Sequence, residues 1–187
     1  MISTRASLVM REFSLLKGTA VVVLSSLTMG LIAPLAIPLS TPIPLAMGPQ
    51  MALFLGAFLG SRRGSLAVMG YLFQGAVLAL PVFALGKSGM HMLVGPTGGY
   101  LVGYVVGAYL TGRIIEGGAF SLGRTCLAFI AGSLAIFTLG ASYLSTMIGV
   151  KSALLAGVLP FILGDFLKNL IAVKVFSRLQ KGKAKLS

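Results

Sequence analysis

Six apolar segments, each bounded by proline, glycine or charged residues, constrain this chain more than any other feature. They lie near residues 15–33, 44–59, 65–82, 97–110, 125–139 and 151–175. A helix that spans the hydrocarbon core of a bilayer needs about 20 apolar residues, and fewer where the bilayer thins. The segments therefore predict an all-α integral membrane protein, a six-transmembrane-helix bundle that forms one domain over residues 1–187.

The last apolar segment is too long for a single span, and Pro160 divides it. Proline favours the first turn of a helix, where its missing N–H is no loss. We therefore expect a short outer helix near residues 152–159 and a final span near residues 160–176.

The composition agrees with a membrane location. Hydrophobic residues make up 57% of the chain and charged residues only 10%, whereas soluble domains carry about 25% charged residues. Little of the surface is thus suited to water. We expect a multi-pass protein of the cell membrane, that is, an inner or plasma membrane.

Basic residues predict the topology. The chain has 15 Lys and Arg against 3 Asp and Glu, and cytoplasmic loops of membrane proteins are rich in Lys and Arg. Only Lys87 and Lys151 fall in loops on one side. The loops and termini of the other side carry Arg5, Arg11, Lys17, Arg62, Arg63, Arg113, Arg124, Lys174, Arg178, Lys181, Lys183 and Lys185.

This asymmetry places both termini in the cytoplasm. The basic tail is expected to touch anionic lipids. No basic face is interleaved with exposed aromatic residues, so nucleic acid is not an expected partner.

The predicted outer connections, near residues 34–43, 83–96 and 140–159, are apolar. Prolines at 34, 38, 42 and 44 exclude a helix interior there, because each lacks an N–H and fixes φ. Non-helical backbone at membrane depth persists only where protein buries it or water reaches it. We therefore expect apolar outer loops that cap a ligand cavity open to the outside.

Asp165 and Lys168 are ionisable residues inside the predicted last span, and Asn169 adds a polar group beside them. Residues three apart share a helix face. Charged groups at this depth are costly and mark functional sites by default. A mutually neutralising pair that only orients the helix is the structural alternative. As a site, the carboxylate accepts N–H bonds and the ammonium group donates to a carbonyl.

The block GPTGGY at residues 95–100 predicts the outer start of a helix, with Thr97 able to cap it. Free N–H groups at such an end can receive a carboxylate, although a purely structural role is equally compatible. Tyr100 would add an apolar wall with a polar tip. Lys87 in the neighbouring loop is suited to close over an anion.

Polar and small residues inside the apolar segments predict helix packing. Gln50 and Gln74 are expected to hydrogen-bond between helices. Glycines spaced four apart allow helices to approach closely; they are Gly56, Gly60, Gly64, Gly99, Gly103 and Gly107.

Four motifs together resemble the biotin-specific S-component (BioY) family of energy-coupling-factor transporters. They are the proline-rich segment at 37–44, LPVF at 80–83, GPTGGY at 95–100 and PFILGDFLK at 160–168. The resemblance implies a six-helix subunit that captures biotin near the outer face.

It also implies roles for particular residues. Asp165 and Lys168 would contact the bicyclic ring of biotin, and Tyr100 would line the pocket, with Thr97 and Lys87 as further contacts. Biotin would be the substrate, with no cofactor. A further implied partner is an energy-coupling module of a transmembrane subunit and ATPases.

Two other functions remain open at this stage. One is uptake of another water-soluble vitamin on the same scaffold, and the other is a non-transport structural role in the membrane. We expect no enzyme, because one intramembrane carboxylate and one loop His make no catalytic constellation. The single His and single Cys also exclude a soft-metal site with several protein ligands.

Overall fold

The structure is a computed structural model that describes residues 2–39 and 43–184. Pro42 and Lys185 lie outside the described residues. The elements in chain order are α1 (Ile2–Ile32), β1 (Ala36–Ile37), β2 (Leu45–Ala46), α2 (Gly48–Ala76), η1 (Ala84–Gly86), α3 (His91–Val94), α4 (Gly98–Glu116), α5 (Leu122–Ile148), α6 (Val150–Gly157) and α7 (Leu159–Ala184).

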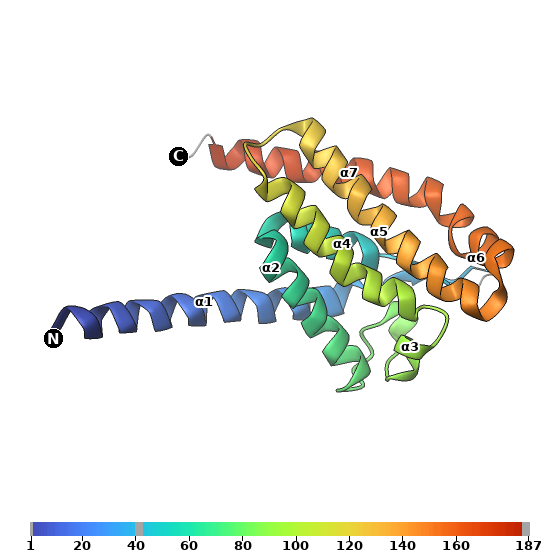
Figure 1. Cartoon of the computed structure of the whole chain (residues 1–187), viewed down its shortest axis with the longest axis horizontal. Coiled ribbons are helices and arrows are strands. Elements are labelled where there is room, and N and C mark those ends of the chain that lie inside the picture. Colours follow the sequence, from blue (N-terminus) through green and yellow to red (C-terminus); the bar gives the residue numbers. More distant parts are fainter. Residues whose placement is uncertain (1, 40–42, 185–187) are drawn as a thin grey trace.

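The helices form a bundle in which α4 lies between α2 and α5, while α1 packs on α2 and α7 on α5 (Figure 1). The start of α1 and the end of α7 lie at the same end of the molecule, on the left in Figure 1. Helix α6 lies at the opposite end. The described part of the proline-rich segment is extended as predicted, and its β1 and β2 pair in an antiparallel hairpin.

Helix α2 reverses direction at Gly60, whose φ of 83° and ψ of 174° are not helical. The carboxylate of Glu116 accepts hydrogen bonds from the backbone N–H of Ser61 at 2.9 Å and from its hydroxyl at 2.7 Å. The second half of α2 therefore begins directly after the glycine and ends at Ala76, so the predicted bounds of 65–82 are wrong. Ala79, with a φ of 52°, lies in the non-helical segment that follows.

Helix α5 is also longer than predicted. It begins after Ser121, whose side chain accepts a hydrogen bond from the N–H of Arg124. It continues through residues 140–148, for which the sequence predicted an outer loop. No proline interrupts this stretch, and the helix ends only at Gly149, whose φ of 81° favours glycine.

The break between α6 and α7 falls at Val158, where φ is −126° and ψ is −59°. Pro160 is the second residue of α7, in the first turn as predicted. The short helix α6 lies at residues 150–157, two residues before its predicted position.

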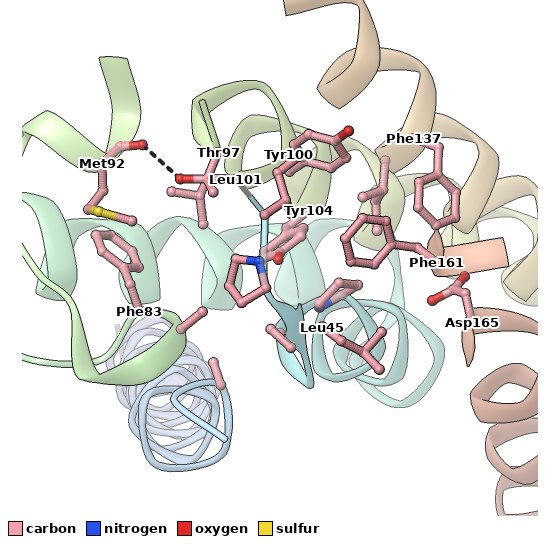
Figure 2. A pocket seen from close by; sticks show the side chains of 18 of the residues that line it. Leu45, Phe83, Met92, Thr97, Tyr100, Leu101, Tyr104, Phe137, Phe161 and Asp165 are labelled. Carbon is pink, nitrogen blue, oxygen red and sulfur yellow. Dashed lines mark hydrogen bonds between the residues drawn. The ribbon is translucent and has the colours of Figure 1, made fainter. Parts of the chain in front are cut away.

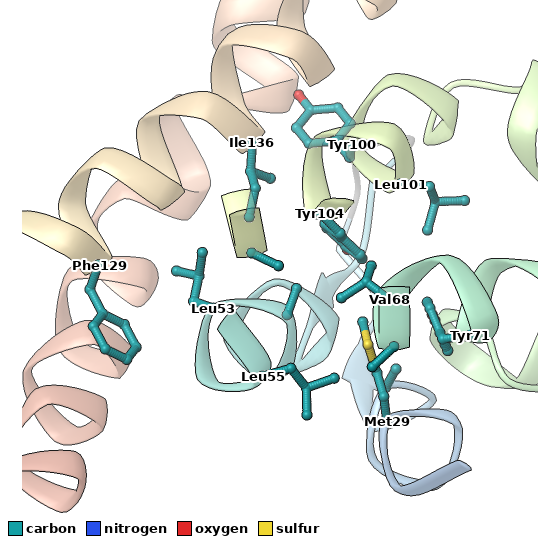
Figure 3. Close-up of a cluster of buried hydrophobic side chains, with 14 of the residues drawn as sticks. Met29, Leu53, Leu55, Val68, Tyr71, Tyr100, Leu101, Tyr104, Phe129 and Ile136 are labelled. Atoms are coloured by element: carbon teal, nitrogen blue, oxygen red, sulfur yellow. The ribbon is translucent and has the colours of Figure 1, made fainter. Parts of the chain in front are cut away.

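The core lies where α1, α2, α4 and α5 meet, and Figure 3 shows Met29, Leu53, Val68, Phe129 and Ile136 in it. Both predicted interhelical glutamine contacts are confirmed. The amide N–H of Gln50 donates to Asn169 in α7 at 2.8 Å, and that of Gln74 donates to Ser26 in α1 at 2.8 Å. These bonds satisfy donors that would otherwise be costly inside an apolar bundle.

Glycines bring the helices together as their spacing predicted. A Cβ on Gly56 would collide with the backbone of Ala108, and one on Gly103 would press on the backbone of Ile136. Helices α2, α4 and α5 therefore pack with their backbones in near contact, which is typical of helices in lipid.

Two helical stretches, Leu122–Ile148 and Val150–Leu179, are long and apolar enough to cross a membrane, and Leu16–Ile32 is a shorter apolar stretch. The surface of α5 carries large apolar side chains that are more than half exposed, such as Leu127, Ile130 and Leu134. An apolar outer face of this kind suits contact with lipid tails.

Gly56→Ala should lower the melting temperature of the detergent-purified protein by several degrees. The added methyl group has no room beside Ala108, and overpacking typically costs about 1–3 kcal/mol. Thermal unfolding would measure the change. Gly123→Ala in the first turn of α5 is the control, because a Cβ there meets only Ser121 Oγ at 3.8 Å. Equal melting temperatures for both variants would contradict the close approach of α2 and α4.

Candidate ligand-binding cavity

A cavity of about 870 Å³, including its open mouth, lies among the hairpin, α2, the loop before α3, α4, α5 and α7. Figure 2 shows Tyr104 near the middle of the cavity, with Asp165 toward one end and Phe83 and Met92 toward the other. All five residues singled out from the sequence line it: Lys87, Thr97, Tyr100, Asp165 and Lys168.

Asp165 lies on the inner face of α7 and is only 6% exposed. Its Oδ2 accepts a hydrogen bond from the side-chain amide of Asn169 at 3.3 Å. A carboxylate buried among apolar side chains is costly unless polar groups compensate it. One bond to a neutral amide compensates only part of that cost, so the carboxylate remains able to accept further N–H donors from a ligand.

Lys168 lies one turn farther along α7, and its ammonium group donates to the carbonyl oxygen of Ala46 at 2.9 Å. This bond joins α7 to β2. The hairpin is held in turn by the β1–β2 pairing and by a bond from the N–H of Met47 to the carbonyl of Leu35 at 3.0 Å. Lys168 therefore connects one wall of the cavity to the loop that borders it.

Tyr100 projects from the first turns of α4 toward α6. Its hydroxyl donates to the carbonyl of Gly157 at 2.7 Å, and its ring lies against Gly140 of α5. The hydroxyl is thus engaged within the protein, and the ring forms an apolar wall. Tyr104, one turn farther along α4, also lines the cavity.

Thr97 occupies the N-cap position of α4, but its side chain does not cap the helix. The backbone of Thr97 is helical, with a φ of −90° and a ψ of −8°, whereas a capping residue normally has extended backbone. The hydroxyl instead donates to the carbonyl of Met92 in α3 at 3.3 Å. The predicted cap is therefore wrong, and Thr97 ties α3 to the start of α4.

Lys87 lies in the loop after η1, at the far end of the cavity from Asp165. Its carbonyl accepts a bond from the N–H of Phe83 at 2.9 Å, which places the two residues side by side. The cavity is therefore polar at both ends, with Asp165 and Lys168 at one and Lys87 with Thr97 at the other. Aromatic and aliphatic side chains line the space between.

Several lining residues were not predicted from the sequence. Ser133 of α5 is the clearest, because a lone serine inside an apolar segment is a usable signal. The others are apolar and cannot be told from core residues by pattern: Tyr71, Phe83, Ile136, Phe137 and Phe161.

This arrangement suits an elongated, mostly apolar molecule with a hydrogen-bonding head at one end and an acid at the other. The carboxylate of Asp165 can accept two N–H donors, and the ammonium of Lys168 can donate to a carbonyl. Within the described residues, no group of three His, Cys, Asp or Glu side chains lies close enough to hold a metal ion.

Comparison with known proteins identifies the family of this chain. The family described as the BioY family matches residues 4–185. The chain belongs to the BioY family.

The similar proteins in this family come from diverse organisms. The chain is 38% identical over 130 residues to a biotin transporter BioY of Thermotoga maritima, which covers 68% of this chain and 76% of the relative. It is 31% identical over 153 residues to a biotin transporter BioY of Rhizobium etli, covering 77% and 81% of the two chains.

The fold matches that of a solved structure. A crystal structure of the S-component for biotin from an ECF-type ABC transporter superposes with a TM-score of 0.79 over 90% of this chain and 93% of that one, at 24% identity. This likeness shows that the chain has the S-component fold.

Tyr100→Phe should lower the free energy of unfolding by about 1 kcal/mol, because the buried carbonyl of Gly157 loses its donor. Chemical denaturation in detergent would measure the loss. Tyr143→Phe is the control, since that hydroxyl donates to Val94 at an exposed site where water can replace it. A loss in Tyr143→Phe as large as that in Tyr100→Phe would contradict the buried bond.

Proposed function

We propose that this chain is a membrane-embedded, biotin-binding subunit for biotin uptake, which captures biotin from the outer side. The observation that carries the proposal is the pair of charged side chains, Asp165 and Lys168, lining one end of a mostly apolar cavity with Lys87 at its other end. Membership of the BioY family and the names of its curated relatives support biotin as the ligand.

In the proposed pose, the ureido ring of biotin lies at Asp165 and Lys168. The ring offers two N–H donors and one carbonyl acceptor, and the two side chains offer the complementary acceptor and donor. Hydrogen bonds that involve charged groups are about twice as strong as neutral ones. The ammonium group of Lys168 has three N–H donors, so it can donate to the ureido carbonyl while it keeps its bond to Ala46.

The valerate chain of biotin would run past Tyr104 and Tyr100 toward the loop that holds Lys87. The middle of the cavity is apolar there, which suits methylene groups. The carboxylate would then meet the ammonium group of Lys87 near the start of α4, where helix N–H groups favour an anion. One ligand thereby satisfies both polar ends.

For topology, we propose a six-span protein of the cell membrane with both termini in the cytoplasm. The distribution of Lys and Arg supports this orientation. So does the position of the start of α1 and the end of α7 at one end of the molecule, opposite α6 (Figure 1). The cavity would then open outward beneath the apolar loops.

Uptake requires energy that this chain does not itself supply. The sequence has no phosphate-binding glycine-lysine loop. We propose that a transmembrane coupling subunit and ATPases provide it, and the S-component fold supports this partnership. The basic end of α7 is proposed to contact anionic lipid headgroups.

Asp165→Asn and Lys168→Ala should each weaken biotin binding about 10- to 100-fold, because each removes a charged hydrogen-bonding partner of the ureido ring. Isothermal titration of the detergent-purified chain with biotin would measure this.

Lys174→Ala is the matched control for Lys168→Ala, because Lys174 is an exposed lysine of the same helix. Unchanged affinity in both site variants would refute the site. A larger thermal stabilisation by thiamine, riboflavin or nicotinate than by biotin would instead favour a different vitamin.

Lys87→Gln should weaken the binding of biotin several-fold and leave the binding of biotin amide unchanged. A partly exposed ion pair contributes about 0.2–1 kcal/mol. Biotin amide has no carboxylate and forms no such pair, so the substitution should not change its binding. Competition against labelled biotin would measure both ligands. Lys151→Gln, which changes a lysine outside the cavity, should affect neither, and equal losses for acid and amide in Lys87→Gln would exclude a carboxylate contact.

A further inference from the structure

Asn169 is the centre of a polar network behind the cavity. Its side-chain N–H₂ donates to Ser133 Oγ at 3.0 Å and to Asp165 Oδ2 at 3.3 Å. Its Oδ1 accepts from Gln50 Nε2 at 2.8 Å. The network thus joins α2, α5 and α7 at the end of the cavity where the charged pair lies.

The network has a single favourable direction. A carboxylate can only accept hydrogen bonds, so the group of Asn169 that faces Asp165 must be its N–H₂. The opposite side of the amide is then an acceptor and needs a donor. Gln50 supplies that donor, and turning the Gln50 amide around would set two oxygens against each other.

Gln50 is only 3% exposed, and its Oε1 has no hydrogen-bond partner among the described residues. A buried, unpartnered amide oxygen is destabilising. Gln50 therefore contributes only through its N–H₂, which holds the amide of Asn169. Gln74 is also a buried bridging glutamine, but its bond to Ser26 lies between α1 and α2 and involves no residue of the cavity.

The network also includes a side chain that lines the cavity. Ser133 lines the cavity, and its hydroxyl oxygen accepts a hydrogen bond from the same Asn169 amide that donates to Asp165. Asn169 itself does not line the cavity, so any effect that it has on a ligand passes through its neighbours.

We propose that Asn169 is a positioning residue for ligand binding. It holds the Asp165 carboxylate turned toward the ligand, and Gln50 fixes the direction of the Asn169 amide. This role rests on the proposed function, because it concerns how the carboxylate meets the N–H groups of biotin. It makes Gln50, on a different helix and outside the cavity, a determinant of affinity.

Titration of the detergent-purified full chain with radiolabelled biotin tests the proposal. Asn169→Leu, of similar size, should weaken binding about tenfold, since it removes a bond to a charged group. Gln50→Met should weaken it about threefold, because Asn169 keeps its own donors but loses their fixed direction. Gln74→Met should bind as the unchanged chain does.

A double-mutant cycle separates positioning from a general structural role. If Asn169 acts through Asp165, the double variant should bind biotin as weakly as Asp165→Asn alone does. If the two residues act independently, their losses of affinity should multiply. Multiplied losses, or full affinity in folded Asn169→Leu, would overturn the proposal.

Two further outcomes are decisive. Should Asn169→Leu fail to give a monodisperse protein, equal affinities of Gln50→Met and Gln74→Met would overturn the positioning role, and the expected threefold difference would support it. Should the unchanged chain itself not bind biotin, the proposed function fails, and the positioning role fails with it.

Discussion

The structure depends on the burial of two charges, on Asp165 and Lys168, inside an apolar helical bundle. Each charge is costly at that depth, by about 2.5–3.5 kcal/mol on insertion scales. Two polar groups offset part of this cost: the side-chain amide of Asn169 donates to Asp165, and the carbonyl of Ala46 in the hairpin accepts from Lys168. These partners compensate the charges incompletely, and under the proposed function a ligand with N–H and carbonyl groups would complete the compensation. On this proposal, the incompletely compensated charges that destabilise the empty site are also the source of ligand affinity.

The rest of the fold holds these groups in place. Gly60 lets α2 reverse within one residue, and Glu116 caps the second half of the helix. Glycines then bring the backbones of α2, α4 and α5 close together, which leaves α7 and the hairpin to border the cavity. Tyr100 and Thr97 connect α4 to α6 and α3 through carbonyl bonds. Helix packing therefore holds the walls of the site, and short connecting segments border its mouth.

Much of the site could be predicted because charged and polar residues are rare in an apolar chain. Asp165, Lys168 and the two bridging glutamines stand out against their neighbours, and the structure gives each a polar partner. Helix limits were less predictable. The sequence does not reveal that a distant carboxylate, Glu116, caps a helix at Ser61, or that α5 continues to Gly149. The rule for helix caps predicted the wrong partner for the Thr97 hydroxyl, because the carbonyl of Met92 in α3 lies within reach and accepts its hydrogen bond instead.

The most direct test of the account is an experimental structure of the chain with biotin bound. The account predicts the ureido ring within hydrogen-bonding distance of Asp165 and Lys168, with the carboxylate at the Lys87 end. Biotin bound in the reverse orientation, or outside this cavity, would contradict it.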